Sequence, residues 1–262
     1  MIKETIGEWS VGIVLSGMIV LISVLLDLPT MLLVYAVRKK YPKIASFALR
    51  TLGADPNVVV SGENSILTIA ILVFASFETD LVFLLSELLR AGADPSYQDS
   101  QGLTALHYAC RFLVPSSAVR LLLKRSPHIL NITTNEFETA FHYAIDHHHQ
   151  WENCLDLVRV LLKYGANPNK TSGLQQTPPL VQACRNRVVP VVELLLKQNV
   201  DVNATDINKR GALIATLHSV RHKRSNFNHV THSHHAHLGT SRGYYHAREM
   251  SPEMQCRYVD ER

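Results

Sequence analysis

Cysteine is scarce in this sequence, with four residues among 262, and none of them belongs to a Cys-x-x-Cys pair. This argues against a disulfide framework and against paired cysteine metal ligands, and it favours a reducing compartment. A large excess of one charge is also missing, because 26 basic residues stand against 22 acidic ones and the two kinds alternate along the chain. The resulting formal charge of +4 is too small to indicate nucleic-acid binding.

The motifs of common catalytic sites are missing as well. The sequence contains no phosphate-binding G-x-x-x-x-G-K-[ST], no H-E-x-x-H zinc motif and no G-x-S-x-G nucleophile motif. We therefore expect a protein that is not an enzyme and that has no cofactor and no built metal site.

The sequence does contain a six-residue pattern that recurs at nearly constant intervals. Its fullest copies are TALHYA at 104–109 and TAFHYA at 139–144. Counted from the apolar third position, the six copies, here called repeats one to six, have their markers at Leu33, Leu67, Leu106, Phe141, Leu180 and Leu213. An alanine follows three residues later in the first five, at Ala36, Ala70, Ala109, Ala144 and Ala183. Gly-Ala-Asp/Asn-Pro turns recur at 53–56, 92–95 and 165–168.

The order of a helix, a Gly-Ala-Asp-Pro turn, a polar excursion and a helix opened by T-A-L-H-Y-A resembles the ankyrin repeat, whose period is about 33 residues. The resemblance covers roughly residues 28–221. It implies an all-α fold, an ankyrin-repeat solenoid of stacked helix-turn-helix units with projecting β-hairpin-like fingers. It also implies that the threonine caps the helix, that the leucine and alanine pack inward, and that His107 and His142 hydrogen-bond between neighbouring repeats.

Local departures from the period lead to further expectations. The markers of repeats two and three, and of repeats four and five, lie 39 residues apart, and we expect the surplus in the loops around 74–80 and 147–152. The turn after repeat three has decayed to Arg-Ser-Pro-His at 125–128, so the next finger should deviate. Cys110 and Cys184, each directly after a signature alanine, should be buried thiols.

Residues 1–27 form an apolar N-terminal segment in which 9–26 are 18 consecutive uncharged residues. This run is long enough for a transmembrane anchor, and the basic residues that follow it at 38–43 would then place the repeats in the cytosol. Alternatively, 9–26 form a degenerate first repeat buried against the next one. Because the run is apolar on every side, it favours the anchor over a solvent-facing cap. We expect a cytoplasmic protein in either case, anchored to a membrane in the first.

Residues 222–262 are rich in histidine and lack helical spacing of apolar residues, which predicts a disordered tail. The histidines at 232, 234, 235 and 237 offer an alternative function in metal binding, but a tract without fixed geometry favours no metal site. The last helix, before this tail, should leave Leu213, Ile214 and Leu217 poorly covered.

The function that the resemblance implies is non-catalytic protein–protein binding, as an adaptor or scaffold. Its partners usually lie along the concave face formed by the fingers and the first helices. The resemblance places the position two residues after the signature alanine on this face, and three arginines there suggest a partner with an acidic stretch. The candidate partner-binding residues are Arg38, Leu72, Arg111, Phe112, Asp146 and Arg185 on the helices, with Tyr97, Gln101, Glu136, Phe137, Leu174, Gln175, Asn208 and Arg210 on the fingers.

Overall fold

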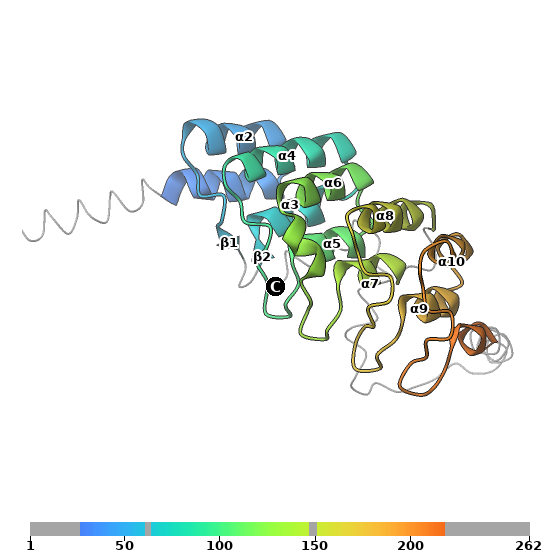
Figure 1. The fold of residues 1–262 in the computed structure, drawn as a ribbon. Helices are drawn as coiled ribbons and strands as arrows, with labels where there is room; N and C mark the ends of the chain where they lie inside the picture. The colour runs from blue at the N-terminus through green and yellow to red at the C-terminus, as the bar shows by residue number, and fades with distance from the viewer. Residues whose placement is uncertain (1–26, 61–63, 147–150, 218–262) are drawn as a thin grey trace, which may run out of the picture.

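The computed structural model of the chain describes residues 27–60, 64–146 and 151–217. They form helix pairs stacked side by side, with the first helices in one row and the second helices in another (Figure 1). The first helices cover residues 27–38, α3 (Ile66–Phe74), α5 (Ala105–Arg111), α7 (Ala140–Ile145), α9 (Pro179–Asn186) and residues 212–217. The second helices are α2 (Pro42–Thr51), α4 (Glu78–Arg90), α6 (Ser116–Arg125), α8 (Trp151–Lys163) and α10 (Val189–Leu196). This arrangement confirms the predicted all-α solenoid.

The fingers project from one side of the two rows (Figure 1). In the first finger, β1 (Val59–Val60) pairs antiparallel with β2 (Asn64–Ser65). Single antiparallel bridges close later fingers, between Thr133 and Thr139, Ser172 and Thr177, and Thr205 and Gly211. The hairpin-like fingers that the sequence predicts are therefore present as very short ladders.

The repeat markers form the core. Leu33, Leu67, Leu106, Phe141 and Leu180 are all buried, and so are the five signature alanines. The sixth marker, Leu213, is 76% exposed, and Ile214 and Leu217 are also exposed, which agrees with the expected poor cover of the last helix. Cys110 and Cys184 are buried as predicted, and Cys154 is a third buried thiol.

The signature threonine and histidine act together as a cap and as a link between repeats. The backbone N–H of Thr104 donates to Nδ1 of His107 (3.1 Å), whose Nε2 lies 3.3 Å from the carbonyl oxygen of Glu138 in the next finger. His142 repeats the arrangement, with Thr139 at its Nδ1 and the carbonyl oxygen of Lys170 2.7 Å from its Nε2. Each ring therefore joins its own helix to the following repeat, which confirms the role that the resemblance implies.

The extra residues of repeat two do not form the long loop that the sequence predicts. Helices α3 and α4 have nine and 13 residues, whereas α5 and α6 have seven and ten. The connection between α3 and α4 is only residues 75–77, so the prediction of a long loop over 74–80 is wrong. The apolar residues of α3 and the periodic leucines of α4 allow both helices to lengthen without exposing the core. In repeat four, α8 also has 13 residues, and residues 147–150 lie outside the described part.

The decayed turn after repeat three has its own structure. Residues Pro127–Asn131 form a short 3₁₀ helix that buries Ile129 and Leu130. Proline at its start suits this geometry, because its missing N–H is not needed in the first turn. The expected deviation of this segment is therefore a tightly wound helical turn ahead of the finger.

A buried carboxylate joins α2 and α4, the second helices of repeats one and two. Glu87 of α4 has a side chain only 3% exposed, and it accepts hydrogen bonds from Ser46 (2.9 Å) and Arg50 (Nη2, 2.7 Å) of α2. Arg90, one turn further along α4, donates to the same carboxylate at 2.7 Å. Hydrogen bonding to the Arg50 guanidinium, above all, holds the pKa of Glu87 below its usual range, although burial opposes this.

Three predictions from the sequence fall outside the described residues. They are the anchor or first repeat at 9–26, the larger part of the surplus loop at 147–152 and the histidine-rich tail at 222–262. Among the helices that the structure does describe, none combines the length and apolar character needed to cross a membrane. The described residues also contain no cluster of three or more His, Cys, Asp or Glu side chains suited to a metal ion.

Gly102 lies where two successive fingers meet, with φ at +78°. A Cβ at this position would lie 2.9 Å from the backbone nitrogen of Asn135. We expect Gly102→Ala to lower the free energy of unfolding by about 1–3 kcal/mol, because the left-handed backbone and the close contact both oppose a side chain. Urea titration followed by circular dichroism would measure the loss.

The matched control is Gly53→Ala, since Gly53 has φ at +70° but nothing within 4 Å of an added Cβ. A smaller loss for Gly53→Ala than for Gly102→Ala would isolate the effect of the finger contact. Equal losses would show that backbone strain alone matters.

Candidate partner-binding face

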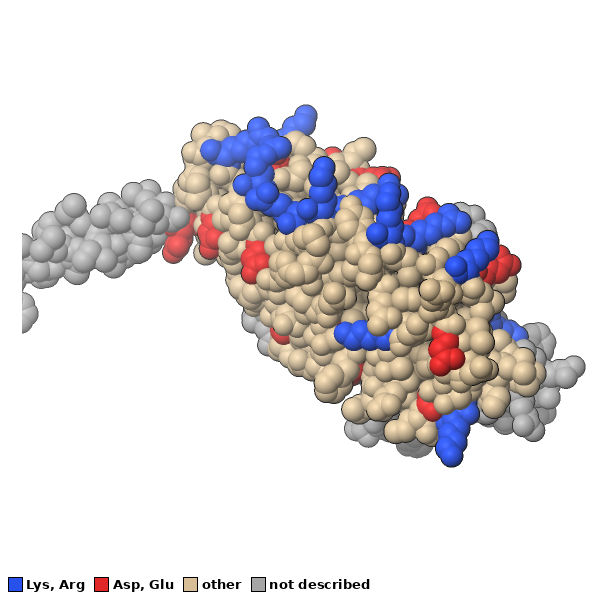
Figure 2. Space-filling model, in the orientation of Figure 1, with Lys and Arg blue, Asp and Glu red and all other residues tan. Residues whose placement is uncertain are grey.

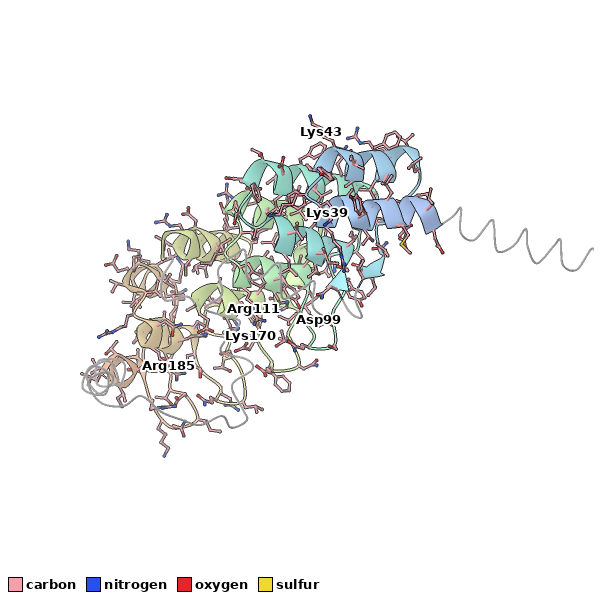
Figure 3. The ribbon with its side chains drawn as sticks, turned by 180° about the vertical axis from the view of Figure 1, so that it is seen from behind. Lys39, Lys43, Asp99, Arg111, Lys170 and Arg185 are labelled. Carbon is pink, nitrogen blue, oxygen red and sulfur yellow. The ribbon has the colours of Figure 1, made fainter. Side chains whose placement is uncertain are left out.

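The first helices and the fingers together form one face, here called the finger-side face. Figure 3 shows Asp99, Arg111, Lys170 and Arg185 on this side of the array, on separate helices and fingers. Of the predicted residues, eight are half-buried: Arg38, Leu72, Tyr97, Arg111, Phe112, Asp146, Arg185 and Arg210. The other six are exposed: Gln101, Glu136, Phe137, Leu174, Gln175 and Asn208. The fourteen predicted residues run from Arg38 in the first helix to Arg210 in the last finger, so they extend along the whole array.

The aromatic–arginine cluster comprises Tyr108, Arg111 and Phe112, from α5 and its C-cap, and Tyr143 of α7. The rings of Tyr108 and Phe112 stack with their centroids 6.3 Å apart and their planes at 9°. Tyr143 meets the edge of the His107 ring at 5.7 Å, so it is fixed by a buried residue of the neighbouring repeat. The cluster is thus a preformed surface held by two adjacent repeats.

Arg111 provides the charge of this cluster. Burial raises the pKa of both Tyr108 and Tyr143, and the positive charge of Arg111 acts against that rise at both rings. The guanidinium therefore lies near both tyrosines. Among the described residues it donates no hydrogen bond and forms no ion pair.

Asp99 supports the cluster from the preceding finger. The Tyr108 hydroxyl donates to its Oδ2 at 2.7 Å, while Oδ1 accepts the backbone N–H groups of Gln101 and Leu103. This carboxylate therefore both shapes the finger and orients the tyrosine.

Arg185, predicted to grip an acidic partner, already faces a carboxylate within the chain. Its Nη2 lies 3.5 Å from Oδ2 of Asp206, and Arg210 donates to the same oxygen from Nε at 2.9 Å. Burial of Asp206 opposes its ionisation, but hydrogen bonds from the backbone and guanidinium of Arg210 hold its pKa below the usual range. Arg185 and Arg210 thus stabilise the finger between repeats five and six.

Other predicted residues also contact the chain itself. Asp146 accepts a hydrogen bond from Asn186 Nδ2 of the next repeat at 3.2 Å. The carbonyl oxygen of Gln175 accepts the backbone N–H of Ile207 at 3.0 Å, so this finger is held by the following one. Leu174 is almost fully exposed beside it.

Sequence reasoning missed Tyr108, Tyr143, Lys170 and Asp206. A signal for the tyrosines was present, because both full copies of the pattern carry tyrosine directly after the histidine. Asp206 also had a signal, because it lies seven residues before its repeat marker, as Asp99 does. Lys170 had none. Lys170 is half-buried, and its ammonium forms no ion pair with the described residues, so it adds a second positive charge to the face.

Comparison with known proteins gives one family and several partial relatives. The family model for ankyrin repeats (3 copies) matches residues 72–172 and 123–206, which together span just over half of the chain. The B-cell lymphoma 3 protein homolog of Mus musculus is 31% identical over 137 residues, which are 52% of this chain and 30% of that protein. CAP-Gly domain-containing linker protein 3 of Xenopus laevis is 37% identical over 100 residues, 37% of this chain and 18% of that protein.

A third relative, the transient receptor potential channel pyrexia of Drosophila melanogaster, is 36% identical over 133 residues, 50% of this chain and 12% of that protein. The chain thus covers less than a third of the length of each of these three proteins. The match to ankyrin repeats supports a role in protein–protein interaction and gives no indication of catalysis. By the extent of the family match and by its stacked helix pairs, the chain belongs to the ankyrin-repeat family.

Proposed function

We propose that this protein is a non-catalytic scaffold whose finger-side face binds a partner protein through an acidic segment. The observation that carries the proposal is Arg111, a half-buried residue near Tyr108 and Tyr143 whose guanidinium makes no hydrogen bond to the described residues. A guanidinium in such a place has donors to offer a ligand. We further propose that binding takes place in the cytoplasm, as the sequence analysis expects.

The chemistry of the cluster favours a carboxylate beside an apolar side chain. A guanidinium binds a carboxylate through two parallel N–H···O bonds, which gives direction as well as affinity. The stacked rings of Tyr108 and Phe112 supply rigid contact area at little cost in side-chain entropy. Arginine and tyrosine are also the residues that contribute most to binding at the centres of interfaces.

The surrounding charges limit how the partner can lie. Lys170 extends the positive surface toward repeat five, whereas Asp99 and Glu136 lie on the fingers beside Arg111. An acidic segment is therefore favoured along the first helices, from Arg111 toward Lys170. It is disfavoured over the finger tips of repeats three and four.

To test the proposal, peptides would be selected from a random displayed library on the full-length chain, without prior choice of sequence. We expect enrichment of peptides with Asp or Glu next to an aromatic or aliphatic residue. Affinities of the selected peptides would then be measured by calorimetry for the wild type, Arg111→Ala and Arg111→Lys. Arg111→Ala should weaken binding by about 10- to 100-fold, the effect of removing one interface hot spot.

Arg111→Lys should recover only part of the affinity, because an ammonium cannot make the bidentate contact. Arg120→Ala is the matched control, since Arg120 is exposed on α6 and its one hydrogen bond among the described residues goes to Ser116 of its own helix. Selection of peptides without acidic residues, or equal affinities for Arg111→Ala and Arg120→Ala, would refute the proposal.

A further inference from the structure

Exposed lysines and exposed apolar side chains gather at one end of the first two helix pairs, away from the fingers. Lys39 and Lys40 close the helix over 27–38, and Lys43 lies in the first turn of α2. Figure 3 shows Lys39 and Lys43 at the same end of this helix pair. The exposed apolar residues among them are Tyr41, Ile44 and Phe47, joined by Phe77 and Phe83 of the neighbouring pair. We call these eight residues the lysine–aromatic patch.

The patch is continuous across the two helix pairs. The Lys40 ammonium lies 4.8 Å from the centroid of the Phe77 ring, which precedes α4. Helix α2 packs directly against α4, and Phe47 and Phe83 are exposed side chains of these two helices. The patch therefore extends over both helix pairs.

The core does not require these apolar residues. Helix α2 buries Ala45, Ser46, Ala48 and Leu49, whereas Ile44 and Phe47 point to solvent, with Phe47 52% exposed. Polar side chains at these two positions would preserve the packing of α2. Their apolar character therefore indicates a contact outside the folded array.

The charges of the patch indicate what kind of surface it can bind. Lys39, Lys40 and Lys43 outnumber the two nearby acids, Glu78 and Asp80 in the first turn of α4, and the Ser117 hydroxyl already donates to Glu78. Figure 2 shows further Lys and Arg side chains along the outer helices from α2 to α8, on the same edge of the molecule. The patch itself thus carries more positive than negative charge, which suits an anionic surface.

Composition favours lipid over protein as that surface. Lysine is depleted at protein–protein interfaces, whereas lysine with exposed aromatic and aliphatic residues is typical of segments that lie on anionic membranes. The uncharged run at 9–26 also ends one residue before the described helix. The helix over 27–38 is about 18 Å long, and it alone separates the end of that run from the lysines of the patch.

We propose that the lysine–aromatic patch docks on the surface of an anionic lipid bilayer. The three lysines contact acidic headgroups, and Ile44, Phe47 and Phe83 enter the interface between headgroups and acyl chains. This docking leaves the finger-side face, which belongs to other helices and to the fingers, available for a protein partner. It does not depend on the proposal for Arg111.

The test is co-sedimentation of the full-length chain with phosphatidylcholine vesicles that contain 0, 15 or 30% phosphatidylserine. Binding should rise with phosphatidylserine and fall with salt. Lys39→Gln, Lys40→Gln and Lys43→Gln together should weaken binding to the 30% vesicles on the order of a hundredfold, from about fivefold for each lysine. Ile44→Ser with Phe47→Ser should also weaken it, with unchanged circular dichroism.

The matched control is Arg120→Gln, Lys124→Gln and Arg159→Gln, which removes three exposed charges from α6 and α8. This variant should keep at least a third of the wild-type affinity. Binding that is independent of phosphatidylserine would assign the interaction to the apolar run at 9–26 and overturn the proposal. So would wild-type affinity in the triple lysine variant, an equal loss in the control, or no binding to any vesicle.

Discussion

Acidification from pH 7.5 to pH 5 is expected to remove about 4 kcal/mol of the free energy of unfolding, about 2 kcal/mol for each of His107 and His142. Burial lowers the pKa of both imidazoles to about 4, from 6.5 for an exposed ring. Between these values the unfolded chain binds the proton and the folded chain does not. Stability is therefore complete above about pH 6.5 and falls as the pH decreases toward 4.

Urea titrations at pH 7.5, 6.5, 5.5 and 5.0 would measure this dependence. His107→Gln and His142→Gln should each be less stable at pH 7.5, because an amide cannot make both hydrogen bonds of the ring. Each should also lose about half of the pH dependence, and the double variant nearly all of it. The pKa values of Glu87 and Asp206 are lowered, so these two carboxylates change the pH dependence of stability only below about pH 4.5 and do not affect the comparison. A double variant as pH-sensitive as the wild type would contradict the explanation.

Removal of the Glu87 carboxylate should have the second large effect. Glu87→Ala is expected to lower the free energy of unfolding by about 3 kcal/mol, the lower end for breaking a buried ion pair. The change leaves Ser46, a buried hydroxyl, without its acceptor, and brings Arg50 and Arg90 together without a counter-charge. Thermal and urea denaturation of the full-length chain would measure the loss.

The control for Glu87 is a surface pair of the same chemistry. Asp156 and Arg159 on α8 lie 3.4 Å apart, and both side chains are more than half exposed. Asp156→Ala should cost less than about 0.5 kcal/mol, because water solvates both groups once they separate. Comparable losses for the two variants would show that burial of Glu87 does not determine its contribution.

The repeated motifs, through their resemblance to the ankyrin repeat, were sufficient to predict the fold. In that family successive helix pairs stack in the same orientation around one core. The burial of Leu67, Leu106 and Phe141 agrees with what the resemblance implies for these positions. The lengths of the helices could not be predicted in the same way. The repeat period does not tell whether an extra residue belongs to a loop or to a helix, and in repeat two the extra residues lengthen the helices.

The candidate site was predicted in part. Counting from the signature alanine locates Arg111, Phe112 and Arg185, but it cannot tell which guanidinium has a partner. Arg185 contacts Asp206, which lies in the following finger. Such pairs depend on side-chain geometry between repeats. The pattern within one repeat contains no information about them.

The hydrogen bonds of His107 and His142 to the following repeats also bear on the order in which the repeats unfold locally. His107 and His142 join repeats three to four and four to five, but the same position holds Thr68 in repeat two and Val181 in repeat five. Thr68 bonds to Ser65 of its own repeat, and valine has no polar atom to share. In helix 212–217, Leu213, Ile214 and Leu217 are exposed and Ala215 is buried. Amide hydrogen exchange should therefore be fastest in repeat six and slowest in repeats three and four, so that the central repeats persist while the last one unfolds and refolds.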